Sequence, residues 1–135
     1  MNTTAISALD TVQQCYEHFG AGNIPAIIEL MDDKIIWKDP GNVGTLYKET
    51  RKGKSEILDF FKELSKQINI TKFDVDKMTE VNGTVFVTGT LKGTGLPTGL
   101  PIDTDWAMEW RVVNGKVTYH HLYTNTYALG KALGI

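Results

Sequence analysis

The chain of 135 residues is 41% hydrophobic and 22% charged and has a net charge of −2, which predicts one globular domain over residues 1–135. Acidic and basic residues are interspersed without a basic run, so we expect no nucleic-acid partner. The chain has no apolar run of about 20 residues, Met1–Ala5 lacks a signal-peptide pattern, and Cys15 is the single cysteine, which together indicate a cytoplasmic protein without membrane contact.

Three amphipathic helices are predicted in the first half of the chain. The first should begin after a cap at Ser7 and stop at Gly20 or Gly22, because glycine tolerates the left-handed conformation that ends many helices. Asn23 can cap a second, shorter helix that has a proline in its first turn. The third helix, over residues 54–69, has the most regular apolar period.

The remaining pattern predicts five strands, four of them in two hairpins. Asn82-Gly83 and Asn114-Gly115 each tolerate the positive φ angles of a tight turn. A polar, glycine-containing loop over residues 41–52 and a short C-terminal tail over residues 126–135, long enough for one helical turn, complete the chain. The expected strands are residues 34–38, 72–81, 84–92, 105–113 and 116–125.

Helices early in the chain and antiparallel strands late indicate an α+β fold in which helices cover one face of a curved sheet. Side chains on the final hairpin should alternate between the two faces of that sheet. The outgoing strand carries on one face Trp106, Met108 and Trp110. The returning strand carries on one face Tyr119, His121, Tyr123 and Asn125. Large rings with polar tips suit a pocket wall, so this hairpin predicts a pocket.

Short segments spread over nearly the whole chain form a recognisable combination: Ala21–Ile27, Met31–Asp33, Trp37–Pro40, Gly53–Ile57, Phe60-Phe61, Trp106, Gly115–Val117, Tyr123–Thr126 and Leu133-Gly134. In this combination the chain resembles the nuclear transport factor 2-like superfamily, in its SnoaL-like and ketosteroid-isomerase-related branch. The resemblance implies a cone-shaped, curved, mixed sheet in the order α-α-β-α-β-β-β-β. It also implies three helices in the N-terminal half that enclose an apolar pocket, and a homodimer formed through the sheet.

The resemblance also assigns roles to single positions. Asp39 stands where ketosteroid isomerases carry their general-base aspartate. Cys15 and Met108 stand where those enzymes have a tyrosine and a protonated aspartate, and neither residue is a strong O–H donor. Asn125 stands where SnoaL-type cyclases have an acid/base aspartate, and an amide cannot exchange a proton in that way. Both of those particular reactions are therefore disfavoured.

Asp39, His121 and Tyr123 are the candidate catalytic residues. Desolvation at the end of an apolar strand would raise the pKa of Asp39 and suit it to remove a proton next to a carbonyl. The alternative is an Asp-Pro turn in which the carboxylate caps backbone N–H groups. His120 and His121 must face opposite ways, and we prefer His121 because it shares a face with Tyr123. It could polarise a substrate carbonyl, or could belong to a polar patch of the core.

The candidate ligand-binding residues combine apolar surface with polar tips. For most of these residues the alternative to ligand binding is packing in the core. For the asparagine the alternative is a hydrogen bond that satisfies backbone groups at the end of the strand. They are Tyr16, Trp37, Trp106, Met108, Trp110 and Asn125. The chain has no HxH or HExxH spacing, so we expect no metal site.

Two classes of function remain open from the sequence. The first is a cofactor-independent enzyme of the isomerase or dehydratase type that acts on a small apolar carbonyl compound, with Asp39 as general base. The alternative is a noncatalytic ligand-binding or dimerisation module of the same fold. A module that binds a partner protein's aromatic side chain is a third, less favoured interpretation. The first two predict a small apolar molecule as the partner of the pocket.

Overall fold

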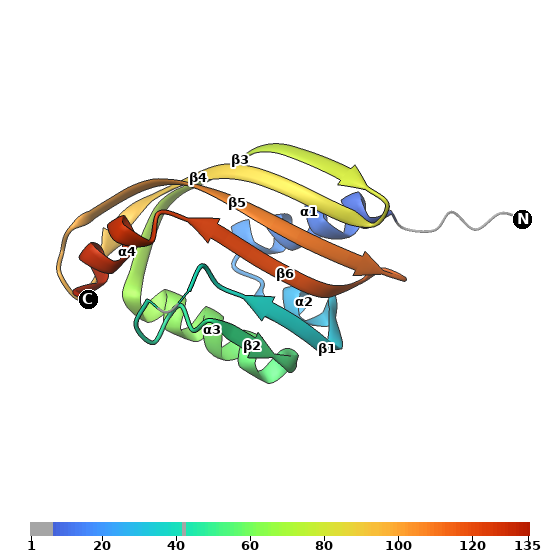
Figure 1. Ribbon diagram of the computed structural model, residues 1–135, viewed down its shortest axis with the longest axis horizontal. Coiled ribbons are helices and arrows are strands. Elements are labelled where there is room, and N and C mark those ends of the chain that lie inside the picture. Colours follow the sequence, from blue (N-terminus) through green and yellow to red (C-terminus); the bar gives the residue numbers. More distant parts are fainter. Residues whose placement is uncertain (1–6, 42) are drawn as a thin grey trace, which may run out of the picture.

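The computed structural model describes residues 7–41 and 43–135, and Figure 1 shows the helices and the curved, open sheet. Residue 42 of the expected loop and residues 1–6, where we expect no signal peptide, lie outside the described residues. None of the helices described is long and apolar enough to cross a membrane. The elements in chain order are α1 (Ala8–Gly20), α2 (Ile24–Glu29), β1 (Met31–Lys38), β2 (Thr50–Lys52), α3 (Gly53–Gln67), β3 (Ile68–Val81), β4 (Thr84–Gly95), β5 (Pro101–Val113), β6 (Lys116–Thr124) and α4 (Thr126–Leu133).

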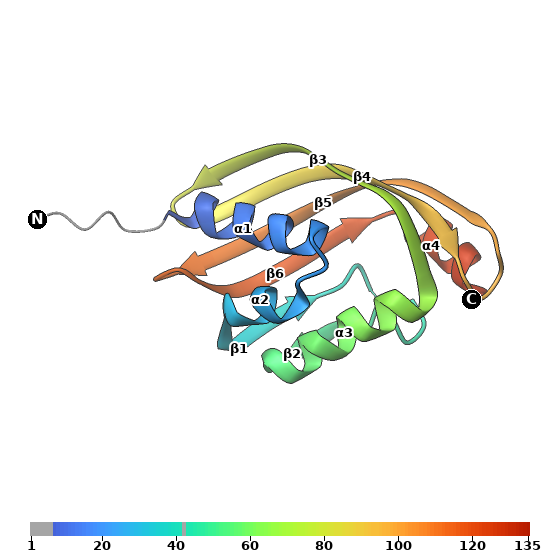
Figure 2. The ribbon, with the colours of Figure 1, turned by 180° about the vertical axis from the view of Figure 1, so that it is seen from behind.

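In the described part of the chain six strands form one sheet, in the order β2-β1-β6-β5-β4-β3. β1 and β6 are parallel, whereas the other neighbouring strands are antiparallel. Helices α1, α2 and α3 lie across the concave face of the sheet, as Figure 2 shows. The predicted α+β class and the curved, mixed sheet are confirmed. One element is missing from the prediction: β2, which pairs with β1 inside the expected loop. In the expected tail, α4 is longer than the single helical turn that the sequence suggests.

The core fills the space between this helical layer and the concave face. Each layer contributes side chains that are fully buried, and burial of each stabilises the fold by roughly 1.5–3 kcal/mol relative to exposure. Examples are Val12 on α1, Ile57 on α3, Ile35 on β1, Val85 on β4 and Val117 on β6.

The helix caps predicted from the sequence are confirmed. The Ser7 hydroxyl accepts a hydrogen bond from the Asp10 backbone N–H at 3.1 Å, and the Asn23 side-chain oxygen accepts one from the Ala26 N–H at 3.3 Å. These bonds satisfy backbone donors that a helix start otherwise leaves without partners. α1 ends at Gly20, one of the two predicted stops.

The absence of a side chain at one glycine of β4 lets the backbone of β3 and a ring of β5 approach this strand closely. A Cβ atom at Gly89 would collide with the carbonyl oxygen of Asp74 on β3 and with the indole ring of Trp106 on β5. Opposite this point β3 has a register shift between Val75 and Lys77. Bulges and glycines of this kind let a sheet curve sharply, and here they bring the Trp106 ring against the sheet.

A β-bulge in the last hairpin determines which side chains face the helices. Asn114 and Gly115 have φ angles of +50° and +74°, as a tight turn requires. Beyond the turn Val112 pairs with Val117, but the next pair is Arg111 with Tyr119, so Thr118 is an extra residue. A bulge of one residue moves every later side chain of its strand to the opposite face. Trp110 is therefore paired with His120, where an uninterrupted hairpin would pair it with Tyr119.

Candidate functional site

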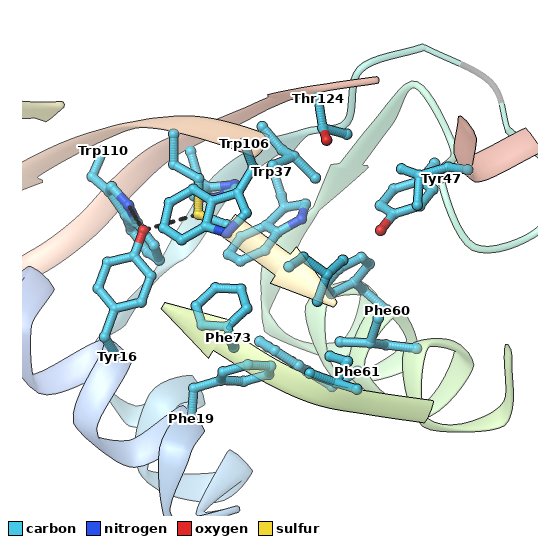
Figure 3. A pocket seen from close by; sticks show the side chains of 17 residues that line it. Tyr16, Phe19, Trp37, Tyr47, Phe60, Phe61, Phe73, Trp106, Trp110 and Thr124 are labelled. Atoms are coloured by element: carbon cyan, nitrogen blue, oxygen red, sulfur yellow. Dashed lines mark hydrogen bonds between the residues drawn. The ribbon is translucent and has the colours of Figure 1, made fainter. Parts of the chain in front are cut away.

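A cavity of about 80 Å³ lies between the concave face of the sheet and the helices. Its wall is almost entirely apolar and carries rings from α1, α3 and four of the strands, together with the loop before β2. Figure 3 shows these rings around the hollow. The aromatic side chains of the wall are Tyr16, Phe19, Trp37, Tyr47, Phe60, Phe61, Phe73, Trp106, Trp110 and His120.

One side of the cavity is a stack of three nearly parallel rings. The Trp106 ring lies 4.9 Å from the Phe73 ring at 14° and 5.8 Å from the Tyr16 ring at 18°. Such offset stacking is favourable beyond the burial of area alone. These rings come from β5, β3 and α1, so the stack also ties the helix to the sheet.

The Tyr16 hydroxyl is engaged within the wall. It accepts a hydrogen bond from the Trp110 indole N–H at 3.0 Å and donates one to the Met108 sulfur, also at 3.0 Å. Burial raises the pKa of Tyr16 far above its ordinary value, so the hydroxyl stays protonated. Tyr16, Trp37, Trp106, Met108 and Trp110 all lie on the cavity wall, and their role in ligand binding stays a prediction.

His120 is the histidine on the cavity wall. Its ring stacks on Trp37 at 3.8 Å and 22° and meets the face of Trp110 at 4.4 Å and 69°. The side chain is 1% exposed, and neither ring nitrogen has a hydrogen-bond partner among the described residues. Burial, with a smaller effect of the neighbouring His121, lowers the pKa of His120 to about 3. The imidazole is therefore neutral at ordinary pH.

The expectation that His121 and Tyr123 enter the cavity is wrong. Both lie on the outer face of β6, where their rings stack at 4.1 Å, and Tyr123 is 49% exposed. The Tyr119 hydroxyl lies 3.2 Å from His121 Nδ1 on the same face. Burial and the nearby Lys38 lower the pKa of His121. The bulge at Thr118 explains why these two side chains point outward. Without the bulge, counting from the turn would place them on the inner face, and the extra residue reverses the two faces of the strand.

Asn125 also lies away from the cavity. Its side-chain oxygen accepts a hydrogen bond from the Ala128 backbone N–H at 3.0 Å and so caps α4. This structural role agrees with the alternative interpretation of Asn125, in which its side chain satisfies backbone groups at the end of the strand. The residue before it, Thr124, reaches the cavity wall, but its hydroxyl donates to the Asp105 carbonyl oxygen at 2.8 Å.

Asp39 is buried near two residues of the cavity wall, Trp37 and Tyr47. Its carboxyl is completely buried, and Oδ2 lies 3.9 Å from the buried Arg51 Nε. Neither carboxyl oxygen forms a hydrogen bond of ordinary geometry with the described residues, although the Trp37 indole and the Lys48 backbone lie near enough to favour its ionised form. Burial outweighs the attraction of Arg51 and raises the pKa of Asp39 to about 7. The pKa of the adjacent Tyr47 is raised strongly by burial and by this carboxyl.

The three candidate catalytic residues border a groove that is separate from the aromatic cavity. A polar groove of about 370 Å³ on the outer side of the sheet is bordered by Asp39, His121 and Tyr123, together with Lys38 and Glu49. The Asp39 side chain is 0% exposed, so its carboxyl is not open to this groove as the side chains stand. The catalytic roles of the three residues stay predictions.

A thin apolar wall separates the cavity from an open groove between the helices and β3. The groove has a volume of about 360 Å³ and shares with the cavity Phe19, Phe61, Leu64 and Ile70. All four side chains are only half-buried. These shared side chains make this side an apolar boundary between the cavity and the open groove.

Several wall residues are missing from the sequence prediction. The sequence prediction prefers His121 to His120 for the pocket, because the bulge at Thr118 leaves no signal in the residue pattern. Tyr47 lies in a segment predicted as a plain loop, where it pairs with Val43 as an isolated bridge. Phe60 and Phe61 belong to the apolar face of the predicted third helix, so their inward direction could be found from the helical period.

No group of three or more histidine, cysteine, aspartate or glutamate side chains within residues 7–41 and 43–135 could hold a metal ion. Cys15 is buried on α1, and its burial raises the pKa of the thiol to about 12. A thiol of this kind is a core residue and a poor nucleophile.

A curved sheet that holds an apolar cavity under three helices defines a class of small pocket-forming α+β proteins. The sequence matches the SnoaL-like domain family over residues 12–120, and the chain belongs to that family. No curated protein matches the sequence.

Several solved structures have the same fold. A nuclear transport factor 2-like protein of unknown function from Burkholderia pseudomallei superposes with a TM-score of 0.86 at 19% identity, over 95% of this chain and 98% of that one. A Bacillus subtilis protein named as a candidate isomerase has a TM-score of 0.80 at 21% identity, over 94% and 92%. TerC, crystallised with polyporic acid, has a TM-score of 0.83 at 21% identity, over 95% and 98%. At these identities the likeness establishes the fold alone.

Proposed function

We propose that this protein binds a small, planar, largely apolar molecule in the aromatic cavity. The observation that carries the proposal is the wall itself, in which stacked and edge-on rings surround a space that packing leaves unfilled. Such walls bind flat molecules by burial of apolar area and by stacking. TerC, a protein of the same fold crystallised with polyporic acid, supports this class of ligand.

The size of the cavity adds a condition to this proposal. Its volume of about 80 Å³ is smaller than the roughly 150 Å³ of an engineered protein cavity that holds benzene. A ring-sized ligand must therefore displace part of the wall. Phe19 and Phe61, which separate the cavity from the neighbouring groove, are the side chains whose rotation would join the two spaces.

A screen of apolar ketones and aromatic acids by thermal shift, followed by calorimetry, tests the proposal. A ligand that binds the native state raises the melting temperature, and the stabilisation grows with the logarithm of one plus its concentration over Kd. Leu122→Phe adds volume at a buried wall position and should weaken binding at least about tenfold. Val113→Phe, at an exposed position on β5, is the matched control. Equal binding by wild type and Leu122→Phe, or no stabilising compound in the panel, would contradict the proposal.

A second candidate function is proton abstraction from a ligand carbon next to a carbonyl, with Asp39 as the general base. This function is favoured because the Asp39 carboxyl is buried, and its pKa of about 7 lies near the pH at which a general base works. Asp39 does not line the cavity, but its neighbours Trp37 and Tyr47 do, so the base must gain contact when the ligand displaces the wall.

Hydrogen–deuterium exchange tests this second candidate directly. Ketones that bind are incubated with the protein in D₂O, and loss of the α-proton signal is followed by proton NMR. Catalysed exchange that disappears in Asp39→Asn and persists in Asp103→Asn, a change at an exposed strand position, supports the enzyme. Binding without exchange leaves the first proposal standing and removes the second.

A further inference from the structure

The polar side-chain atoms of the cavity wall are few, and only some of them are hydrogen-bonded. The Tyr16 hydroxyl bonds Trp110 and Met108, and the Thr124 hydroxyl bonds the Asp105 carbonyl oxygen. The Trp37 indole is turned toward the buried Asp39, whose ionised form it favours. The indole N–H groups of Trp37 and Trp106 and the imidazole of His120 have no hydrogen-bond partner among the described residues. The hydroxyl of Tyr47, which Figure 3 shows directed toward the interior of the cavity, also remains for a ligand. An indole N–H can only donate, whereas the imidazole and the hydroxyl can each donate and accept, so His120 and Tyr47 are the more versatile partners.

His120 is held in place but has no hydrogen bond. Trp37 covers one face of its ring at 3.8 Å, and Trp110 meets it edge-on at 4.4 Å. Both ring nitrogens are buried and unpartnered within the part of the chain that the structure describes. A buried polar group without a partner is unfavourable, and a side chain kept in this state beside a cavity has the capacity to bond a bound molecule.

The protonation states of His120 and Tyr47 limit what these two side chains can bind. Burial keeps His120 in its uncharged form, with one N–H donor and one nitrogen acceptor. The pKa of Tyr47 is raised, so its hydroxyl keeps its proton. No lysine or arginine among the described residues lines the cavity, and therefore nothing on the wall compensates the charge of a buried carboxylate.

We propose that His120 and Tyr47 together bind an oxygen substituent on the edge of an uncharged flat ring, so that the ligand class is phenols and ring ketones, with hydrocarbons and carboxylates disfavoured. This inference rests on the proposed function and specifies the ligand of the same cavity. A phenol hydroxyl can donate to the imidazole nitrogen and accept from the tyrosine hydroxyl, whereas a ring carbonyl can accept from both N–H and O–H.

Three probes of nearly equal shape test the inference: 4-methylphenol, toluene and 4-methylbenzoate, each titrated by calorimetry and by tryptophan fluorescence. We expect 4-methylphenol to bind at least about tenfold more tightly than toluene, because one well-placed hydrogen bond has an effect of this size. The benzoate should bind most weakly of the three. In protein with ¹⁵N-labelled histidine, 4-methylphenol should shift the ring-nitrogen signals of His120, and toluene should not.

Two variants and two matched controls separate the polar contact from packing. Tyr47→Phe removes one oxygen, and His120→Phe removes both ring nitrogens while keeping a ring. Each should reduce the preference for 4-methylphenol over toluene to less than about threefold, with toluene binding retained. Tyr119→Phe, on the outer face of β6, and His18→Phe, on α1 and outside the cavity wall, should leave the preference unchanged.

The outcomes distinguish this inference from the proposed function. If toluene binds but wild-type protein shows no preference for 4-methylphenol, or if both variants keep the preference, this inference is overturned and the cavity remains a binding site for apolar rings. Absence of binding by all three probes would overturn the proposed function, and this inference with it.

Discussion

Asp39 illustrates how burial and charge compete at one residue. The Arg51 guanidinium is anchored by the carbonyl oxygens of Thr45, Leu46 and Glu56 at 2.9–3.3 Å. Its Nε therefore stays 3.9 Å from the carboxyl, too far for a direct hydrogen bond. Attraction at this distance lowers the pKa of Asp39 less than burial raises it. The result is a carboxyl that changes protonation near neutral pH.

We expect carboxyl-region ¹³C NMR to show Asp39 titrating near pH 7, in place of its ordinary value of 3.8. Arg51→Met should raise this pKa further, because it removes the attracting charge and leaves the burial. A pKa at or below the ordinary value would show that the charge of Arg51 outweighs burial, and it would remove the general-base role.

Among the elements, β4 depends on a residue without a side chain. Gly89→Ala would force its Cβ into the Asp74 carbonyl oxygen and the Trp106 ring. We expect a loss of at least about 2 kcal/mol in the free energy of unfolding, as for other overpacked sites. Gly20→Ala is the matched control, since nothing lies within 4 Å of its Cβ position at the end of α1. Urea denaturation that gave both variants the same stability would show that β4 can move away from β3 at little cost.

The sequence predicts these elements unevenly, for physical reasons. Helix caps at Ser7 and Asn23 are local hydrogen bonds, and the Asn-Gly turns are local backbone preferences, so both can be predicted from neighbouring residues. β2 is only three residues long and exists through its pairing with β1, which no local pattern encodes. The direction of His120 depends on the bulge at Thr118, and that bulge is a property of two paired strands.

For the molecule as a whole, Asp39 and His120 make opposite contributions to the pH dependence of stability. The folded state holds the Asp39 proton more tightly than the unfolded state, so stability falls as pH rises toward about 7. The folded state disfavours a proton on His120, so stability falls as pH drops from the ordinary histidine value toward about 3. Between about pH 4 and about pH 6.5 the two trends oppose each other.

Single variants should reveal each trend. Relative to wild type, Asp39→Asn removes the first contribution, so the variant should gain stability as pH rises through this window. His120→Phe removes the second, so its relative stability should fall over the same range. Each change should amount to roughly 2–4 kcal/mol, measured by urea denaturation at several pH values. Parallel curves for wild type and both variants would contradict the assigned protonation states.

The outer face of the sheet is the surface through which we expect two copies to associate. It carries Phe86, 48% exposed, and Tyr123, 49% exposed, with the rings of Tyr119 and His121 nearby in the sheet. Light scattering should give about twice the 15.0 kDa of one chain. Tyr123→Asp should shift the population toward one copy, because it would bury a charge at the contact, whereas Tyr127→Asp on α4 should not. A wild-type protein that stays at the mass of one chain at tens of micromolar would exclude this dimer.

The extra residue at Thr118 also affects how relatives should be compared. In a homologue whose hairpin lacks the bulge, the residue at the same count from the Asn-Gly turn points to the opposite side of the sheet. Alignment from the turn would then equate a cavity-facing side chain with a solvent-facing one, whereas alignment from the end of β6 would preserve the inward set His120, Leu122 and Thr124. Specificity in such homologues could thus change by insertion or loss of one residue, without substitution of any side chain that meets the ligand.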